Sequence, residues 1–198
     1  MLSSKLIFKL FLTDPHALKP GEIVPVFHNL IQTKAIAEHL LIDVADYEHV
    51  PEGPGSVLVA QEVNIHLDHG QGKPGLMYVR KQPIAGDLVA RIREVLRFTL
   101  DIAHRLEQHP ALADKAKFRT DEMVFRINDR LHGPNNAATF DAVKPALEAV
   151  LSEAYPIADL TFEHRSDAME LFEIHVRSST NPGTAAMLEC LGFFPAIV

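Results

Sequence analysis

Glu173, His175 and Arg177 alternate with apolar residues near the end of the chain, within the segment 171–177. In a strand this spacing places all three side chains on one face. A carboxylate beside an imidazole can hold one tautomer of the ring near neutral pH, which is the requirement for general acid–base chemistry. The same residue types also form ladders of charges across strands, and from the sequence alone we favour that simpler interpretation.

A second group of side chains suited to metal binding lies at His66, Asp68 and His69. His66 and Asp68 share one face of a strand, and His69 follows at the turn. A divalent cation such as Zn²⁺ needs further ligands. The candidates for the remaining positions are His175, Glu173 and Glu163. Because the chain has 11 histidines, we favour a hydrogen-bonded histidine at a strand end, and we predict no metal and no other cofactor.

The strands and helices that position these side chains are predicted by the spacing of apolar residues. Leu6, Phe8, Leu10 and Leu12 alternate as in a half-buried strand. A single apolar stripe over 87–107 predicts a long amphipathic helix. The predicted strands are 4–13, 40–45, 56–68, 76–81, 122–128, 160–165 and 171–177, and the predicted helices are 23–35, 87–107, 143–155 and 184–191.

The order of these elements occurs twice, which suggests an internal duplication. Residues 5–9 match residues 122–126, and Tyr78-Val-Arg80 matches His175-Val-Arg177. The alternative is that any two βαββα units resemble one another by pattern alone. We favour duplication, because the matching blocks occur in the same order in both halves.

The predicted fold class is α+β, with two ferredoxin-like repeats of the βαββα type. The first repeat, βαβββα, spans 1–110, the second, βαββα, spans 117–198, and the two pack as one compact unit. The sheet is expected to be mainly antiparallel, with the helices packed on one face. The strand 56–68 has no counterpart in the second repeat, which makes it a place to look for function.

The sheet face turned away from the helices is predicted to be polar, because the matched polar positions alternate with the apolar ones. We expect this face to carry Lys9, Asp43, Tyr78, Arg80, Arg126, Glu163, His175 and Arg177, joined by Glu62, Asn64, His66 and Asp68 of the added strand. Water, a partner or the other repeat must cover it.

Charge and composition exclude several classes of protein. The net charge is −7 and no run of Lys or Arg occurs, which argues against nucleic-acid binding. No segment approaches the roughly 18 uninterrupted apolar residues of a membrane-spanning helix. The single cysteine, Cys190, excludes an internal disulfide, favours the cytoplasm, and is expected in the core. The loop 70–75 precedes a strand and lacks the spacing of a phosphate-binding loop, so we interpret it as a hairpin loop.

Two functions remain open, and we rank a cytoplasmic binding or scaffolding module ahead. Its polar face would hold a small anionic ligand or meet a partner. The candidate ligand-binding residues are Arg80, Arg177, Asp43, Glu163, Lys9 and Arg126. The tail 193–198 is too apolar to remain in water, so it should dock on the chain's own sheet edge or on another subunit, and we expect a homo-oligomer.

The alternative is a cofactor-independent enzyme that acts on a small anionic substrate in a pocket between the two repeats. Here His175 or His66 would be the general acid or base and Tyr78 a hydrogen-bond donor. Arg80 and Arg177 would anchor the substrate through charge-assisted hydrogen bonds.

Overall fold

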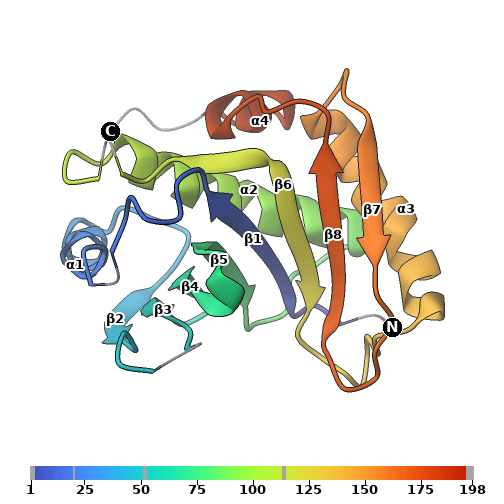
Figure 1. The fold of residues 1–198 in the computed structure, drawn as a ribbon, viewed down its shortest axis with the longest axis horizontal. Coiled ribbons are helices and arrows are strands. Elements are labelled where there is room, and N and C mark those ends of the chain that lie inside the picture. Colours follow the sequence, from blue (N-terminus) through green and yellow to red (C-terminus); the bar gives the residue numbers. More distant parts are fainter. Residues whose placement is uncertain (1–2, 20, 51–52, 113–114, 195–198) are drawn as a thin grey trace.

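One antiparallel sheet connects both halves of the chain (Figure 1). The computed structural model describes residues 3–19, 21–50, 53–112 and 115–194, and within them eight strands lie in the order β2-β3-β4-β5-β1-β6-β8-β7. The strands are β1 (Leu6–Leu12), β2 (Leu41–Asp46), β3 (Ser56–Ala60), β4 (Val63–Asp68), β5 (Gly75–Arg80), β6 (Phe118–Ile127), β7 (Leu160–His164) and β8 (Phe172–Ser178). Because β1 pairs directly with β6, the halves share a sheet instead of presenting two facing sheets.

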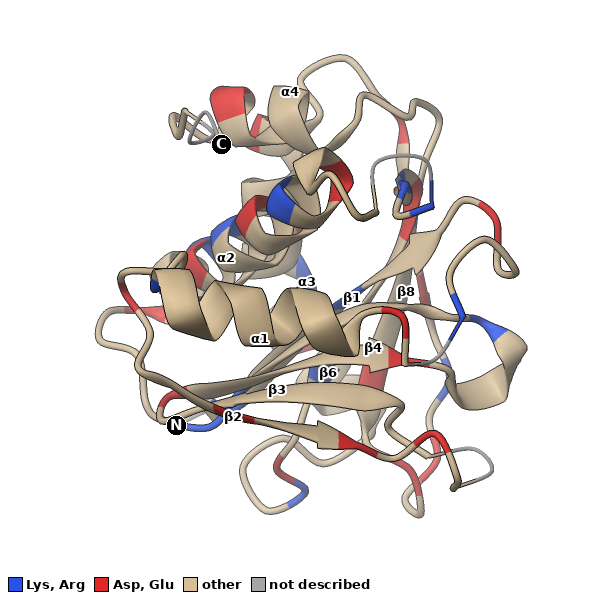
Figure 2. Ribbon diagram, turned by 90° about the vertical axis from the view of Figure 1, so that its left-hand side faces the viewer, with Lys and Arg blue, Asp and Glu red and all other residues tan. Residues whose placement is uncertain are grey.

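The α-helices of the described residues lie on one side of the sheet, as predicted. They are α1 (Val24–Thr33), α2 (Leu88–Gln108), α3 (Ala137–Ala154) and α4 (Thr184–Cys190), and a short 3₁₀ turn, η1, spans Gly70–Gly72. Figure 1 shows α2 and α3 behind the strands, and Figure 2 shows α1 on the same side as α2. In the described part of the chain, no helix has both the length and the apolar character needed to cross a membrane.

Phe8 and Phe125 meet edge to face at the centre of the core, with their ring centroids 5.2 Å apart. The two residues are also direct partners in the ladder between β1 and β6. Their fully buried neighbours Leu6 and Leu10 point to the same face, as predicted, but both faces of β1 are buried, so the prediction of a half-buried strand is wrong. Burying each such side chain contributes about 1.5–3 kcal/mol, so this central strand pair anchors the fold.

The predicted long strand 56–68 is wrong. The chain turns back at Gln61 and Glu62, so that β3 and β4 form an antiparallel hairpin in which Val59 pairs with Asn64. The turn contains no Gly, Pro, Asn or Asp, which are the residues that usually reveal a hairpin in a sequence. Glu62 therefore lies in a turn and not in the polar row of a strand.

The two halves differ in strand order, and the predicted pair of ferredoxin-like repeats is not confirmed. In the second half β7 lies next to β8, whereas in the first half β3 and β4 separate β2 from β5. The matched pair Tyr78 and His175 is also out of register. Phe8 pairs with Tyr78, and the corresponding Phe125 pairs with Ile174.

That difference of one residue reverses the face on which the β5 side chains lie. Tyr78 is fully buried among the core residues under the helices, in the row of Phe8. Arg80 lies two residues further along the same face of β5. The prediction that Tyr78 and Arg80 lie on the polar face is therefore wrong.

Two smaller features in the C-terminal half also differ from the predictions. Helix α3 begins at Ala137, so Pro145 lies inside it and not in its first turn, and Asn136 caps it by accepting from the Thr139 amide at 2.9 Å. Cys190 is exposed, so its predicted place in the core is wrong. Of the apolar tail, Phe193 packs against the core, Phe194 is exposed, and 195–198 lie outside the described residues.

Candidate functional site

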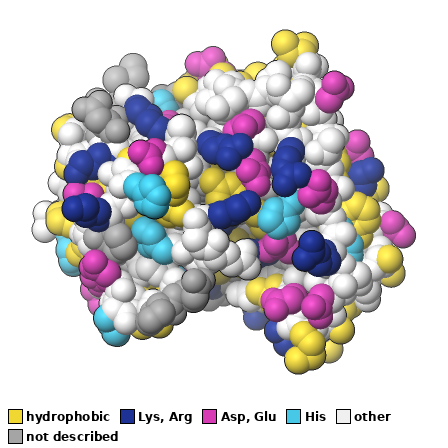
Figure 3. Space-filling model, in the orientation of Figure 1, with side chains coloured by type: hydrophobic (Ala, Val, Ile, Leu, Met, Phe, Trp, Pro, Cys, Tyr) yellow, Lys and Arg dark blue, Asp and Glu magenta, His cyan; other side chains and the backbone are white. Residues whose placement is uncertain are grey.

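A groove of about 870 Å³ lies on the sheet face opposite the helices, above β6, β8 and β7. Figure 3 shows charged and histidine side chains gathered on this face. The groove is lined by four cationic side chains, four acidic ones, two imidazoles and three other residues. They are Lys73, Arg126, Arg165 and Arg177; Glu163, Asp167, Glu170 and Glu173; His164 and His175; and Gln71, Asn135 and Leu171.

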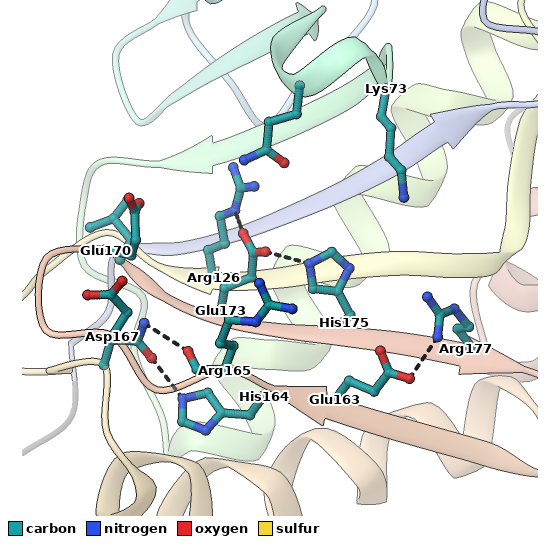
Figure 4. A pocket seen from close by; sticks show the side chains of 13 residues that line it. Lys73, Arg126, Glu163, His164, Arg165, Asp167, Glu170, Glu173, His175 and Arg177 are labelled. Atoms are coloured by element: carbon teal, nitrogen blue, oxygen red, sulfur yellow. Dashed lines mark hydrogen bonds and ion pairs between the residues drawn. The ribbon is translucent and has the colours of Figure 1, made fainter.

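Strand register brings the central polar residues together. Arg126 of β6 lies directly opposite Glu173 of β8, and His175 lies two residues further along β8 on the same face. Glu163 of β7 is the direct partner of His175 on the other side. All four residues therefore lie on neighbouring strands within one polar patch (Figure 4).

The Glu173 carboxylate binds two of these neighbours at once. Its Oε2 accepts from Arg126 Nε, and its Oε1 lies 2.5 Å from His175 Nε2. Burial alone would raise the pKa of Glu173, but the hydrogen bond from His175 and the charge of Arg126 outweigh it, so the pKa lies below its usual value. Because an ionised carboxylate can only accept, Nε2 of His175 carries the proton.

The His175 ring keeps its other nitrogen available. Its side chain is 32% exposed, and within the described part of the chain Nδ1 has no hydrogen-bond partner. Figure 4 shows that side of the ring facing the space below Lys73. The result is an imidazole whose protonated nitrogen is held by a carboxylate and whose basic nitrogen faces the groove.

The charges of the groove are distributed unevenly along it. Lys73 is 55% exposed and lies 3.4 Å from Glu122, and Arg177 donates to Glu163 at 2.8 Å. Arg165 has no ion pair among the described residues and extends from the β7–β8 hairpin toward Glu173 (Figure 4). Asp167 and Glu170 lie at the hairpin end of the groove, away from Lys73.

A second imidazole, His164, closes the hairpin end. Its Nε2 lies 2.7 Å from Oδ1 of Asn135, which in turn donates through Nδ2 to the Arg165 carbonyl at 3.2 Å. The ring stacks on Phe140 with centroids 5.0 Å apart. Burial lowers the pKa of His164, so the neutral ring is favoured at neutral pH.

Comparison of the chain with protein-family models, curated proteins and solved structures finds no match. The function must therefore be inferred from the groove and its chemistry.

The structure brings together part of the predicted set. Arg126, Glu163, His175 and Arg177 line the groove, whereas Asp43 lies exposed on β2 at the far edge of the sheet. Tyr78 lies on the helix side, where its hydroxyl is 3.0 Å from His39 Nε2. Arg80 is on that side too, and its Nε donates to the Gln82 carbonyl.

Lys9 lies on the predicted face, but it is buried and bound to Asp68. The Lys9 ammonium donates to Asp68 Oδ2, and burial lowers the pKa of Lys9 although the carboxylate opposes this effect. Asp68 is therefore already neutralised by a cation. Because Lys9 is buried in this ion pair, it is not available to contact a ligand as predicted.

The His66, Asp68 and His69 cluster does not form a metal-type site in the structure. In the described residues no group of three or more His, Cys, Asp or Glu side chains is arranged to hold a metal ion. His66 Nδ1 and His69 Nε2 are buried with no hydrogen-bond partner there. Burial lowers the pKa of both rings, which favours their neutral forms.

Sequence reasoning missed several groove residues. Lys73 lies in a loop that we interpreted only as a connection, and it forms one wall of the groove. Arg165, Asp167 and Glu170 come from the β7–β8 hairpin. The density of charge in this short hairpin was the available signal, but nothing in the sequence shows that the hairpin lies near Lys73.

The lining defines which chemistry the chain can supply. It offers cations for an anion, carboxylates, and an imidazole oriented for proton transfer. The described lining contains no Ser, Thr, Cys or Tyr side chain, so a hydroxyl or thiol nucleophile is not provided there.

Proposed function

We propose that the groove binds a small anionic molecule, such as a carboxylate of metabolite size. The observation that carries this proposal is the pair of cations on opposite walls, Lys73 and Arg165, of which Arg165 has no ion pair among the described residues. A volume of about 870 Å³ lies within the range of small-molecule sites.

The polarity of the groove orients such a ligand. Asp167 and Glu170 would repel an anionic group at the hairpin end, whereas Lys73 attracts it toward the opposite wall. The protein carries a net charge of −7, so its overall field does not attract anions. Binding would therefore depend on these local cations, and it should weaken as salt concentration rises.

The proposal is tested by NMR titration of the protein with pyruvate, succinate and inorganic phosphate. We expect at least one of these anions to shift the resonances of groove residues. Lys73→Glu should weaken that binding at least tenfold. The matched control is Lys115→Glu, because Lys115 is also an exposed lysine in an ion pair, with Glu22 at 2.7 Å, and it does not line the groove.

Two outcomes would contradict the proposal. One is the absence of any groove shift with all three anions. The other is equal weakening of binding by Lys73→Glu and Lys115→Glu, which would indicate a general effect of charge.

We also propose that the protein forms a homo-oligomer through the outer edge of β2. Leu40, just before β2, and Ile42 within it are 60% and 57% exposed, and among the described residues β2 pairs only with β3. A second copy that adds its own β2 would bury both side chains and satisfy the outer backbone groups. Native mass spectrometry should show a dimer for the wild type and a monomer for Ile42→Lys. A monomeric wild type would rule out this interface.

We also propose that the protein is cytoplasmic, because its single cysteine, Cys190, is unpaired.

A further inference from the structure

The orientation of His175 extends the proposed function from binding to proton transfer. Glu173 occupies Nε2 of the ring at 2.5 Å, and Arg126 holds the second oxygen of the same carboxylate. Arg126 and Glu173 are direct partners on β6 and β8, so the three side chains are held by paired strands and not by loops. Such support fixes the direction of the ring.

A ladder of cross-strand charges is present, because Arg126 pairs with Glu173 and Arg177 pairs with Glu163, but this ladder does not include the His175 ring. The cross-strand neighbours of His175 are Val124 and Glu163. Val124 is apolar, and Glu163 binds Arg177 at 2.8 Å. The imidazole is instead bound by Glu173 of its own strand. This leaves Nδ1 directed toward the groove and without a partner among the described residues (Figure 4).

We propose that Nδ1 of His175 is a general base and acid that moves a proton within a small 2-oxo carboxylate held in the groove. This inference rests on the proposed binding function. Glu173 is then a positioning residue, which keeps the proton on Nε2 and stabilises the imidazolium that forms. Arg126 positions Glu173 in turn.

The step needs no partner beyond the substrate. The bond between hydrogen and the carbon next to the 2-oxo group breaks, and a bond between that hydrogen and Nδ1 forms. The electron pair of the broken bond forms a carbon–carbon double bond, and the π pair of the carbonyl group moves to its oxygen, so that an enolate results. The imidazolium then returns the proton to the enolate carbon or oxygen, which gives the starting compound or its enol. In D₂O the imidazolium exchanges this proton for a deuteron of the solvent before the return, which gives the exchanged compound.

The cations of the groove suit this substrate class. The carboxylate would lie against Lys73, and Arg165 extends from the opposite wall toward the Glu173 and His175 pair, where the enolate oxygen would form. A cation placed where negative charge develops stabilises the transition state more than the ground state.

The test is the exchange of the methyl protons of pyruvate and of the C3 protons of 2-oxobutyrate in D₂O, followed by proton NMR. The wild type should accelerate exchange of at least one probe above the buffer rate. His175→Gln should reduce the enzymatic part about 100-fold or more, which is the usual range for general acid–base catalysis. His132→Gln is the matched control, because His132 pairs with Asp129 at 3.1 Å outside the groove, and it should exchange at the wild-type rate.

The variant Glu173→Gln distinguishes a role of Glu173 in positioning His175 from a role in stabilising the fold. The ¹⁵N shifts of His175 should show a proton on Nε2 in the wild type, and this preference should be lost in Glu173→Gln. The pH dependence of the exchange rate should also differ between the wild type and Glu173→Gln. A purely structural role of Glu173 would change neither the tautomer nor the pH profile while the protein remains folded.

The outcomes distinguish the two proposals. Binding without accelerated exchange overturns proton transfer and leaves the binding function intact. Equal exchange rates for the wild type and His175→Gln also overturn it. The absence of both binding and exchange overturns the binding function and this inference together.

Discussion

The Tyr78 hydroxyl donates a hydrogen bond to Nε2 of His39, 3.0 Å away, in the core beneath α2. His39 Nδ1 lies 2.9 Å from the Glu38 carbonyl, which can only accept, so Nδ1 carries the proton and Nε2 accepts from Tyr78. Both rings also contact Phe98, with centroids 4.4 Å from His39 and 5.8 Å from Tyr78. Tyr78 therefore packs in the core and does not line the groove.

Tyr78→Phe should destabilise the protein by about 1–3 kcal/mol, because it leaves a buried acceptor on His39 without a donor. Urea unfolding would measure the change. Tyr47→Phe is the control, since Tyr47 is exposed and its substitution should change the free energy of unfolding by less than about 0.5 kcal/mol. Anion binding in the groove should be the same for Tyr78→Phe and the wild type, and a loss of binding without a loss of stability would contradict this assignment.

His39 should make stability fall as the solution becomes acidic. Burial lowers the pKa of His39 from 6.5, so the unfolded chain takes up its proton at a higher pH than the folded protein does. The contribution of the neutral His39 ring to the free energy of unfolding is complete above pH 6.5. It is lost as the pH falls from 6.5 toward the lower pKa of the folded protein. In His39→Gln, the free energy of unfolding measured between about pH 5 and 8 should depend less steeply on pH. His66, His69 and His164 share the lowered pKa, so some dependence should remain.

Asp68→Asn should cost about 3–5 kcal/mol, because it leaves the buried Lys9 ammonium without its counter-charge. Replacing both residues, as Lys9→Met with Asp68→Leu, should recover most of that loss, since no buried charge then remains. Chemical unfolding of the two variants and of Lys9→Met alone gives the comparison. If the double variant is as unstable as Asp68→Asn, the loss does not come from an unpaired buried charge, and the explanation is wrong.

Gly75→Ala should be strongly destabilising, because a Cβ at this position would lie 2.2 Å from the Leu10 carbonyl oxygen of β1. We expect a cost of about 3 kcal/mol, typical of overpacking against rigid backbone. Gly72→Ala is the comparison, since beyond its chain neighbours no atom of the described residues lies within 4 Å of its added Cβ, and the positive φ of +64° opposes the change. It should cost about 1 kcal/mol. Equal melting temperatures for the two variants would contradict this explanation.

Arg126→Met should raise the pKa of Glu173, because burial then acts on a carboxylate that has lost its guanidinium partner. A ¹³C NMR titration of the glutamate side chains would report the shift. Arg119→Met is the matched control, since Arg119 of the same strand binds Asp121 and should leave Glu173 unchanged. An unchanged Glu173 titration in Arg126→Met would remove Arg126 from the proposed set of positioning residues.

The face of a strand could be predicted where polar and apolar residues alternate. In β8, Phe172, Ile174 and Val176 point to the core, and Glu173 and His175 point away, as expected. In β5 the residues Leu76, Met77, Tyr78 and Val79 are all buried. No alternation distinguishes the two faces there, so a comparison with the other half of the chain misplaced Tyr78 by one position.

The sequence by itself determined the α+β class, the antiparallel sheet, the side on which the helices pack and the polar face of β8. These follow from local periodicity, which is a property of neighbouring residues. Only the tertiary structure decided that Lys9 is neutralised by Asp68, that Tyr78 binds His39, and that Lys73 meets the β7–β8 hairpin across one groove. Each of these contacts joins residues far apart in the chain, and such contacts depend on strand register and packing, which no local pattern specifies.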